Sequence, residues 1–308
     1  MKASVLIASY NSSKTIRETV DSVLNQEGFS DFEIVVSDDC STDDTVSILR
    51  EYAAANPGRF QIIENKKNQG VVKNYFTALA NAKGEYIFTI GHDDKFLPSM
   101  MSSSVDFLDA NKEYSACYSK AKLFLDSTGD FSGKTIGTSG CTFEDLLIHN
   151  NIPALCGCVR AEVFHQYLSD IKPMEKNWSL EDYPYWLYIS ATGKIKFLDE
   201  VNAIYRVTKG SVMHKNGDKD ITMLKNVLSM KLFFADRFAK NDAEKEHFEK
   251  LCNEGFSYEM ANHYLYEGDF KNFRKYLKTS PKNKKVMAKY ILSLTPLTQK
   301  LLLGKMQY

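Results

Sequence analysis

Short apolar segments rich in β-branched residues alternate with segments of helical periodicity through the first 90 residues of this chain. Four of the segments are expected to be strands, at residues 5–8, 32–36, 60–63 and 85–90. Helices are expected between them, at residues 16–24, 42–54 and 70–82. This alternation predicts an α/β fold around a doubly wound sheet. Because the crossovers are right-handed, the loops after the strands gather at one sheet edge, where such folds bind ligands.

The rest of the chain contains a Gly-, Ser- and Thr-rich stretch and a long helical region. Residues 127–140 predict a loop or a hairpin. Helical periodicity runs from about residue 215 to residue 266, and a basic tail follows. We therefore expect one domain at residues 1–214 and a helical extension at residues 215–308.

Composition excludes several classes of protein. No run approaches the roughly 18 consecutive apolar residues of a membrane span, and the N-terminal apolar stretch is too short for a signal peptide. These features predict a cytoplasmic protein. The six cysteines show no paired Cys-x-x-Cys motifs, so we expect reduced, mostly buried thiols rather than a zinc site or a disulfide framework.

The charge of the chain is balanced in total but unevenly distributed. Residues 271–308 contain ten basic and no acidic residues, which leaves 29 basic and 39 acidic residues in residues 1–270. A terminal segment whose charged residues are all basic usually binds an anionic partner. An anionic membrane surface, a nucleic acid and a solvated helical face are the alternatives. The aromatic residues of this segment form no evident stacking platform, which counts against nucleic acid.

Two carboxylates, Asp38 and Asp39, stand at the end of the second expected strand. Helix capping accounts for the polar residues that follow them, which are Ser41, Asp43 and Asp44. Capping does not account for two adjacent carboxylates at a strand end, where like charges repel. A ligand-binding role is therefore expected for Asp38 or Asp39.

A second carboxylate pair, Asp93 and Asp94, follows the fourth expected strand at the same sheet edge. Such a pair suits a hard divalent cation, Mg²⁺ or Mn²⁺, which is typically held by one or two carboxylates together with water and substrate phosphates. The alternative is a solvated turn. The neighbouring His92 is either a substrate contact or a polar loop residue.

A third pair, Glu181 and Asp182, lies in a stretch crowded with aromatic residues. Aromatic side chains pack against sugar faces, and by excluding water they raise the pKa of a carboxyl group, which suits a general base. The alternative is that the pair begins a helix.

Short motifs occur in order along the chain, at residues 5–11, 38–43, 68–70, 84–87, 92–94, 180–183 with Trp186, and 204–206. Together they resemble the ordered motif set of the family 2 glycosyltransferases of the GT-A fold. The resemblance covers about residues 3–214. It implies a GT-A-like, Rossmann-type mixed sheet flanked by helices, in which residues 1–115 bind the donor and residues 116–214 the acceptor.

The resemblance implies transfer of a sugar, with inversion, from a nucleotide-diphosphate donor to an acceptor hydroxyl in bacterial surface-polysaccharide synthesis. Asp182 matches the residue that takes the acceptor proton. Asp93 and Asp94 match the residues that hold Mn²⁺ or Mg²⁺, and His214 is a further candidate ligand. The residues matched to the nucleotide-sugar site are Ala8, Tyr10, Asn11, Asp38, Asp39, Gly70, Lys73 and Asp93. The residues matched to the acceptor side are Glu181, Trp186 and Arg206.

The chain departs from the family pattern at the metal motif. Gly91 stands where many relatives carry the first Asp of an Asp-x-Asp motif, although some members function with only the last two acids. Many bacterial relatives act on polyprenyl-diphosphate-linked acceptors at the cytoplasmic leaflet. The resemblance therefore also implies such an acceptor, with the basic tail docked on the inner face of the cytoplasmic membrane.

Two other functions compete with this interpretation. A nicotinamide-dependent dehydrogenase would need Gly-x-Gly-x-x-Gly after the first strand, where residues 10–13 are Tyr-Asn-Ser-Ser. A non-catalytic carbohydrate- or nucleotide-binding protein on the same fold is the alternative that we retain. The presence of Asp93, Asp94 and Asp182 together favours an enzyme.

Overall fold

The computed structural model describes residues 1–208, 218–282, 284–296, 298–299 and 302. The chain forms two compact units. The sheet unit contains residues 1–142 and 151–208, and the helical unit contains residues 143–150 and 209–308. The boundary predicted at residues 214–215 lies outside the described residues.

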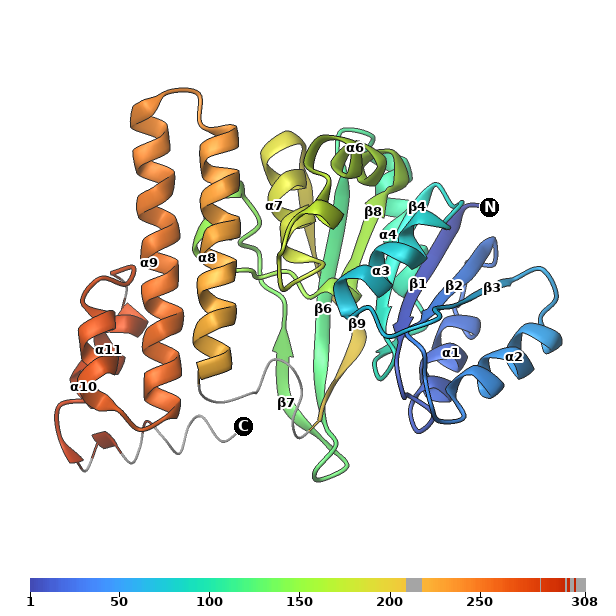
Figure 1. The fold of residues 1–308 in the computed structure, drawn as a ribbon, viewed down its shortest axis with the longest axis horizontal. Coiled ribbons are helices and arrows are strands. Elements are labelled where there is room, and N and C mark those ends of the chain that lie inside the picture. The colour runs from blue at the N-terminus through green and yellow to red at the C-terminus, as the bar shows by residue number, and fades with distance from the viewer. Residues whose placement is uncertain (209–217, 283, 297, 300–301, 303–308) are drawn as a thin grey trace. The chain divides into compact units, whose positions relative to one another are not determined.

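The sheet unit is built around one mixed sheet (Figure 1), with the strand order β3-β2-β1-β4-β8-β6-β9-β5 and β7 paired with β6. The four strands expected from the sequence form its parallel half, as β1 (Ala3–Ser9), β2 (Phe32–Asp38), β3 (Phe60–Glu64) and β4 (Tyr86–Gly91). β1 pairs with β2 and β4, and β2 pairs with β3, all in parallel. The carboxyl ends of these strands therefore meet at one edge.

The other half of the sheet is mixed. Its strands are β5 (Lys95–Phe96), β6 (Ala116–Leu125), β7 (Asp130–Ile136), β8 (Gly157–Arg160) and β9 (Ile195–Val207). The short β8 lies antiparallel between β4 and β6, and β6 runs parallel to β9. β6 and β7 pair antiparallel, so the Gly-rich stretch is a hairpin.

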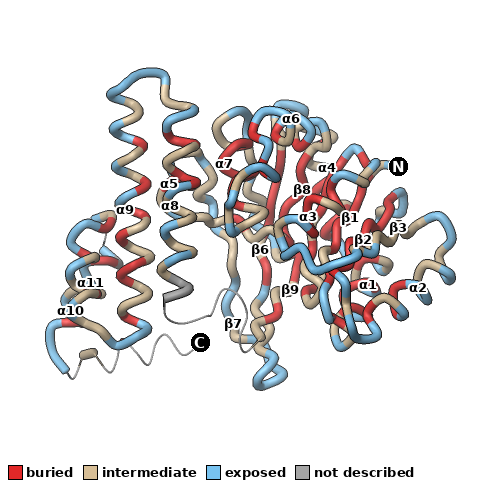
Figure 2. The backbone as a smooth tube through the Cα atoms, viewed as in Figure 1, coloured by how far each residue is buried: buried red, intermediate tan, exposed pale blue. Residues whose placement is uncertain are grey.

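Helices cover the sheet on both faces. One apolar cluster joins alternate residues of β1 and β2 to α1 (Ile16–Leu24), α2 (Thr45–Ala55) and α4 (Met100–Ala110). Alternate side chains of a strand face opposite sides of the sheet, so the other residues of β1 and β2 pack against helices on the opposite face. α3 (Val71–Ala80) packs on β1 and β2, and α6 (Ala161–Ile171) packs on β8 and α7 (Tyr183–Thr192). Both strands β1 and β2 are consequently buried over most of their length (Figure 2).

The helical unit consists of α5 (Phe143–Ile148), α8 (Asp218–Phe238), α9 (Asp242–Tyr266), α10 (Phe270–Leu277) and α11 (Lys284–Leu292). Apolar residues of α9, α10 and α11 form a separate core that includes Leu265, Phe273 and Val286. In the part of the chain that the structure describes, no helix is both long and apolar enough to cross a membrane. The six cysteines are free thiols, four of them buried.

The helix expected at residues 16–24 is confirmed as α1, but no side chain caps its start. Its N-cap residue is Thr15, whose side chain makes no capping hydrogen bond, and Ser12 and Ser13 lie before the helix. The main-chain oxygen of Ser12 instead accepts from the N–H groups of Thr15 and Ile16. The Ser12 hydroxyl is buried and has no partner among the described residues.

Candidate active site

Asp38 and Asp39 are both buried, and each organises a loop at the sheet edge. The Asp38 carboxylate accepts hydrogen bonds from the hydroxyls of Ser9 and Ser41, at 3.0 and 2.6 Å. The Asp39 carboxylate accepts from the N–H groups of Gln69 and Gly70, both at 2.8 Å. Since hydrogen bonds to the charged form stabilise a carboxylate, these donors offset the repulsion between the two acids. Asp39 thereby fixes the segment that leads into α3.

The loops after β1 and β2 are joined by side-chain bonds rather than by helix capping. Asn11 adopts a positive φ of 48°, and its side chain accepts from the N–H of Thr42. The hydroxyl of Ser41 accepts from the N–H of Asn11, and Asp43 accepts from that of Ser13. Asp44 occupies the N-cap position of α2 without a side-chain capping bond. Capping was therefore the wrong prediction for Ser41, whose hydroxyl joins the two loops, and for Asp44, whose side chain makes no capping bond.

Asp93 and Asp94 form a tight turn directly after β4, closed by a hydrogen bond from the N–H of Asp94 to the Gly91 carbonyl at 3.2 Å. Their carboxylates fold back over Gly91. A Cβ on Gly91 would lie 2.8 Å from Asp94 Oδ2 and 3.2 Å from Asp93 Oδ1. The glycine at this position therefore makes room for two converging carboxylate oxygens.

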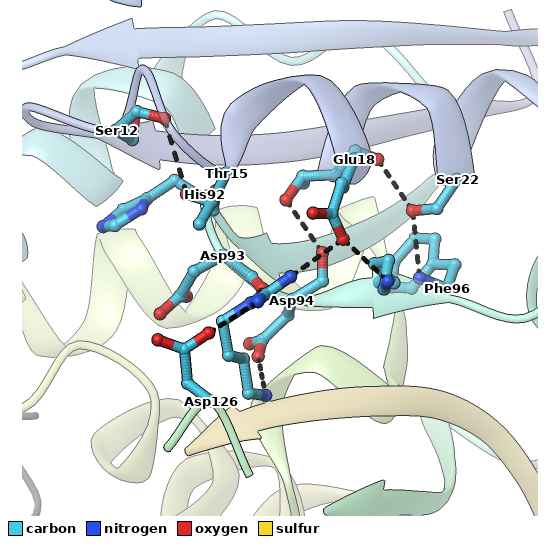
Figure 3. Close-up of polar contacts among 12 residues, drawn as sticks. Ser12, Thr15, Glu18, Ser22, His92, Asp93, Asp94, Phe96 and Asp126 are labelled. Carbon is cyan, nitrogen blue, oxygen red and sulfur yellow. Dashed lines mark hydrogen bonds and ion pairs between the residues drawn. The ribbon is translucent and has the colours of Figure 1, made fainter. Parts of the chain in front are cut away.

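The turn at residues 92–94 is held by hydrogen bonds from α1 and β9 (Figure 3). The hydroxyls of Thr15 and Thr19 donate to the carbonyls of His92 and Asp94, at 3.0 and 2.8 Å. The N–H of Arg206 donates to Asp94 Oδ1 at 2.9 Å. These bonds fix both the main chain of the turn and the orientation of one carboxylate.

The Arg206 side chain bridges three elements beneath this turn. Its guanidinium pairs with Glu18 of α1 at 2.8 Å and with Asp126, just after β6, at 2.9 Å. Its Nε donates to the Asp93 carbonyl at 2.9 Å (Figure 3). Only 9% of the side chain is exposed. The resemblance matched Arg206 to the acceptor side, but in this structure its donors are used to support the carboxylate turn.

The donor set of the turn fits a divalent cation. Burial first, and then the charge of Asp93, raise the pKa of Asp94 to about 8. A cation between the two converging oxygens would relieve this repulsion, and carboxylate oxygens are preferred ligands of Mg²⁺ and Mn²⁺. Within the described residues, no group of three or more His, Cys, Asp or Glu side chains could hold a metal, so the remaining ligands would be water and substrate phosphates. His214 lies outside the described residues.

Glu181 and Asp182 directly precede α7. Asp182 occupies the N-cap position of this helix, so the pair does begin a helix, although its carboxylate makes no capping hydrogen bond. Burial first, and then the charge of Asp182, raise the pKa of Glu181. Tyr75 of α3 stacks on Tyr185 of α7 with a centroid distance of 6.4 Å. Burial raises the pKa of Tyr75, and the charges of Glu181 and Asp182 raise it further.

A cavity of about 290 Å³ lies between the start of α3, at residues 69–73, and residues 173–178, which precede α7. Lys73 and Trp178 are among the residues that line it. Tyr10 is 44% exposed at the end of β1. The end of β1 thus presents an exposed aromatic ring, and the start of α3 presents a basic side chain beside a cavity.

The structure does not bring Trp186 to this surface. Trp186 is fully buried, and its indole packs on β8, where a Cβ on Gly157 would lie 2.6 Å from Cζ2. Its role on the acceptor side therefore has no support from this geometry. Ala8 belongs to β1 and contributes its backbone to the sheet edge.

The sequence analysis missed four residues of the site. Glu18, Thr19 and Asp126 support the carboxylate turn, and Tyr75 lies beside the Glu181–Asp182 pair. Glu18 and Thr19 sit on an ordinary amphipathic helix, so no local pattern distinguishes them. Their roles depend on partners that are distant in the sequence.

Comparisons with known proteins agree with this arrangement. The family model described as Glycosyl transferase family 2 matches residues 4–167. The chain is 29% identical over 226 residues to the Escherichia coli protein named UDP-Glc:alpha-D-GlcNAc-diphosphoundecaprenol beta-1,3-glucosyltransferase WfaP, covering 73% of this chain and 84% of WfaP.

Solved structures share the fold. A structure of residues 1–349 of Staphylococcus aureus TarS, in complex with UDP-GlcNAc, matches with a TM-score of 0.69 at 20% identity, covering 99% of this chain and 89% of that fragment. The mannosyltransferase PcManGT of Pyrobaculum calidifontis, in complex with GDP-Man and Mn²⁺, matches with a TM-score of 0.61 at 15% identity, covering 98% and 83% of the two chains. The mixed sheet with flanking helices is therefore the GT-A architecture.

Proposed function

The chain belongs to glycosyltransferase family 2, so it is a glycosyltransferase that uses a nucleotide-sugar donor, and we propose that it works by inversion at a divalent cation with Asp182 as the general base. The bacterial relatives further support a role in surface-polysaccharide synthesis.

The observation that supports this proposal is that Tyr75 links the surroundings of the two acidic pairs. Its hydroxyl shares a 3.3 Å hydrogen bond with Thr89 of β4, two residues before Gly91. Its ring stacks on Tyr185, three residues after Asp182, and the charges of Glu181 and Asp182 act on it. Sugar transfer between two bound substrates requires a pair suited to a cation near a pair suited to proton transfer.

Asp182 accepts the proton of the acceptor hydroxyl while that oxygen forms a bond to the anomeric carbon. The bond from this carbon to the diphosphate breaks, and both of its electrons leave on the diphosphate oxygen. General-base catalysis of such a step typically contributes 10²–10⁴-fold. Asp93 and Asp94 would hold a divalent cation, which would supply positive charge for the leaving diphosphate. The Mn²⁺ in the PcManGT complex supports this choice of metal.

The donor is held at the ends of β1 and β2 and at the start of α3. Tyr10 offers a ring for the nucleotide base, and Lys73 offers a positive charge near the phosphates. Asp39 fixes the backbone at Gly70, and Asp38 and Asn11 fix the facing loops. Glu181 lies on the acceptor side, next to the base.

We propose an acceptor that carries phosphate. WfaP is named for a diphosphoundecaprenol-linked acceptor, and TarS, which is 35% identical over 111 residues, is named a poly(ribitol-phosphate) beta-N-acetylglucosaminyltransferase. A lipid-linked acceptor would be met at a membrane. The basic C-terminal segment is suited to that surface.

The feature that supports membrane docking is an exposed apolar stripe on the C-terminal segment. Met287 and Ile291, one helical turn apart on α11, and Leu294, two residues after the end of that helix, are each more than half exposed. No acidic residue occurs between residues 271 and 308. An apolar face flanked by lysines is typical of helices that lie in the interface of an anionic bilayer.

A nucleotide-sugar screen tests the proposed activity. The full chain is heated with UDP-, GDP- and dTDP-linked sugars, with and without Mn²⁺, and the donors that raise the melting temperature are assayed for transfer. A bound ligand stabilises by mass action, by about 2.7 kcal/mol at 100 times Kd. Metal-dependent stabilisation and transfer are expected with at least one donor. Binding without turnover would indicate the non-catalytic binding protein instead, and no binding to any donor would contradict the proposal.

A further inference from the structure

The hydroxyl of Tyr167 has no hydrogen-bond partner among the described residues, although the side chain is fully buried. Tyr167 lies on α6, and its ring meets Tyr185 and Tyr188 of α7 at centroid distances of 6.4 and 5.5 Å. Buried hydroxyls without a partner are costly, and native proteins keep few of them. The group is therefore a candidate for a task that the unliganded chain does not display.

The neighbouring tyrosines differ from Tyr167 in having partners. The Tyr188 hydroxyl donates to Asp170 at 2.6 Å, and the Tyr75 hydroxyl is bonded to Thr89. Tyr185 hydrogen-bonds to Tyr75. An available donor thus remains on Tyr167 in the middle of a tyrosine cluster.

The groups that act on Tyr167 lie on the side of the proposed base. Burial raises the pKa of Tyr167, and Tyr75 and the charge of Asp182 raise it further. The titratable groups around it are Tyr75 from α3, Tyr185 and Tyr188 from α7, Asp182 at the start of α7, and Asp170, three residues further along α6. Asp182 lies three residues before Tyr185 and six before Tyr188, so it belongs to the face of α7 that Tyr167 packs against.

Glu181 and Asp182 are adjacent, partly buried carboxyls, which disfavours a double negative charge. Burial, and then the charge of Asp182, raise the pKa of Glu181. Proton transfer from the acceptor requires that Asp182 stays ionised, and a hydrogen bond donated to its carboxylate would favour that state.

We propose that Tyr167 is a positioning residue whose hydroxyl donates to the Asp182 carboxylate, so that Asp182 rather than Glu181 receives the acceptor proton. This inference rests on the proposed function of Asp182. The Tyr167 hydroxyl has no acceptor within hydrogen-bond distance among the described residues, so the Asp182 side chain has to move toward it, and catalytic hydrogen bonds often tighten only when substrates bind.

Carboxyl ¹³C NMR of the full chain tests the hydrogen bond without any turnover. Asp and Glu are labelled, and the two signals are assigned from their loss in Asp182→Asn and Glu181→Gln. In Tyr167→Phe the apparent pKa of the Asp182 signal is expected to rise by about one unit, the effect of one hydrogen bond to a charged group. Tyr188→Phe, which loses the hydroxyl bonded to Asp170, is the matched control and should leave the Asp182 titration unchanged.

Thermal unfolding shows whether the variants fold. Tyr167→Phe keeps the ring and removes an unpartnered hydroxyl, so its melting temperature should equal or exceed that of the wild type. Tyr188→Phe should melt lower, because a buried hydrogen bond is lost. An unchanged Asp182 titration in folded Tyr167→Phe would overturn the proposal.

Kinetics give a second readout once a donor and an acceptor are known. In Tyr167→Phe the acid limb of the rate profile should move up by about one pH unit, so that the rate one unit below the midpoint falls several-fold while donor KM stays constant. Equal profiles in Tyr167→Phe and Tyr188→Phe would overturn the proposal. Absence of transfer in the wild type would instead contradict the proposed function, and the NMR titration would still decide whether Tyr167 bonds to Asp182.

Discussion

The main-chain N–H of Arg206 donates a 2.9 Å hydrogen bond to the carboxylate of Asp94, although 112 residues separate the two in the sequence. The Arg206 guanidinium then reaches back to Glu18 and Asp126. One residue of β9 therefore controls both the backbone and the side chain of the turn that is proposed to hold the metal.

Arg206→Met is expected to weaken Mn²⁺-dependent UDP binding about tenfold and to destabilise the sheet unit by about 2–3 kcal/mol. The substitution leaves Glu18 and Asp126 without their shared cation, although half-exposed carboxylates lose less than fully buried ones. The control is Arg17→Met, whose pair with Glu51 on α2 is well exposed and should be worth less than 1 kcal/mol. Calorimetry and chemical unfolding measure the two effects, and equal behaviour of the two variants would remove Arg206 from the site.

Gly91→Ala should impair metal binding more than it impairs folding. The new Cβ would lie 2.8 Å from Asp94 Oδ2, so at least one carboxylate must turn away from the point where the two converge. Gly129→Ala is the matched control, because it strains a positive φ in the β6–β7 turn but meets no atom within 4 Å. Calorimetric titration of Mn²⁺ and UDP should show weaker binding in Gly91→Ala alone. Unchanged affinity would place the metal elsewhere.

Asp182→Asn should abolish transfer while leaving donor binding nearly intact, because the amide keeps the size of the side chain but cannot accept a proton. A loss of 10²–10⁴-fold is the usual contribution of a general base. Glu181→Gln is the comparison, since a neutral amide resembles the protonated carboxyl that burial favours there, and it should retain more than a tenth of the rate. The reverse ranking would make Glu181 the base. Asp106→Asn makes the same carboxylate-to-amide change at an exposed position, so it is the control and should leave the rate of transfer unchanged.

The stability of the helical unit should rise between pH 8 and pH 10.5. Burial lowers the pKa of Lys231 from 10.5 to about 8, despite the opposing charge of Glu259. In that interval the unfolded chain holds a proton that the folded chain has lost, so unfolding becomes less favourable as pH rises, by up to about 3 kcal/mol.

Lys231→Met isolates this contribution from other groups that titrate in the same range. It removes the 2.9 Å bond to the Ile148 carbonyl at every pH, but it should also remove the pH dependence. The difference in melting temperature between wild type and variant should therefore change from pH 7 to pH 10, whereas exposed Lys225→Met, on the same helix, should show a constant difference. A constant difference for Lys231→Met would contradict the buried-lysine assignment.

The C-terminal stripe should bind anionic but not neutral vesicles. Phosphatidylcholine vesicles with and without phosphatidylglycerol are sedimented with the full chain, and about 0.5 M salt should release much of the bound protein by screening. Ile291→Ser should weaken binding about tenfold, the loss expected for one buried aliphatic side chain. Phe131→Ser, equally exposed on β7, should have no effect. Equal binding to both vesicles, or to neither, would contradict the membrane proposal.

The local pattern of the sequence was sufficient for the parallel half of the sheet. Residues 5–8, 32–36, 60–63 and 85–90 lie within β1 to β4 apart from Glu85, because a buried strand between turn residues is readable within about ten residues. The short β8 was not predicted, because four residues are too few to show the alternation of apolar and polar residues that marks a strand. Its place between β4 and β6 depends on hydrogen bonds to strands that are distant in the sequence.

The features of the candidate site also divide into those that the sequence predicts and those that depend on tertiary contacts. Because strand ends carry their loops to one edge, the sequence alone determined that Asp38–Asp39 and Asp93–Asp94 would meet there, and the motif order identified the family. Only the tertiary structure decided that Arg206 supports the carboxylate turn, that Trp186 is buried in the core, and that Tyr167 keeps an unpartnered hydroxyl. The partners of Arg206 lie 80 and 188 residues away in the sequence, at Asp126 and Glu18, and a contact of that range leaves no local periodicity to read.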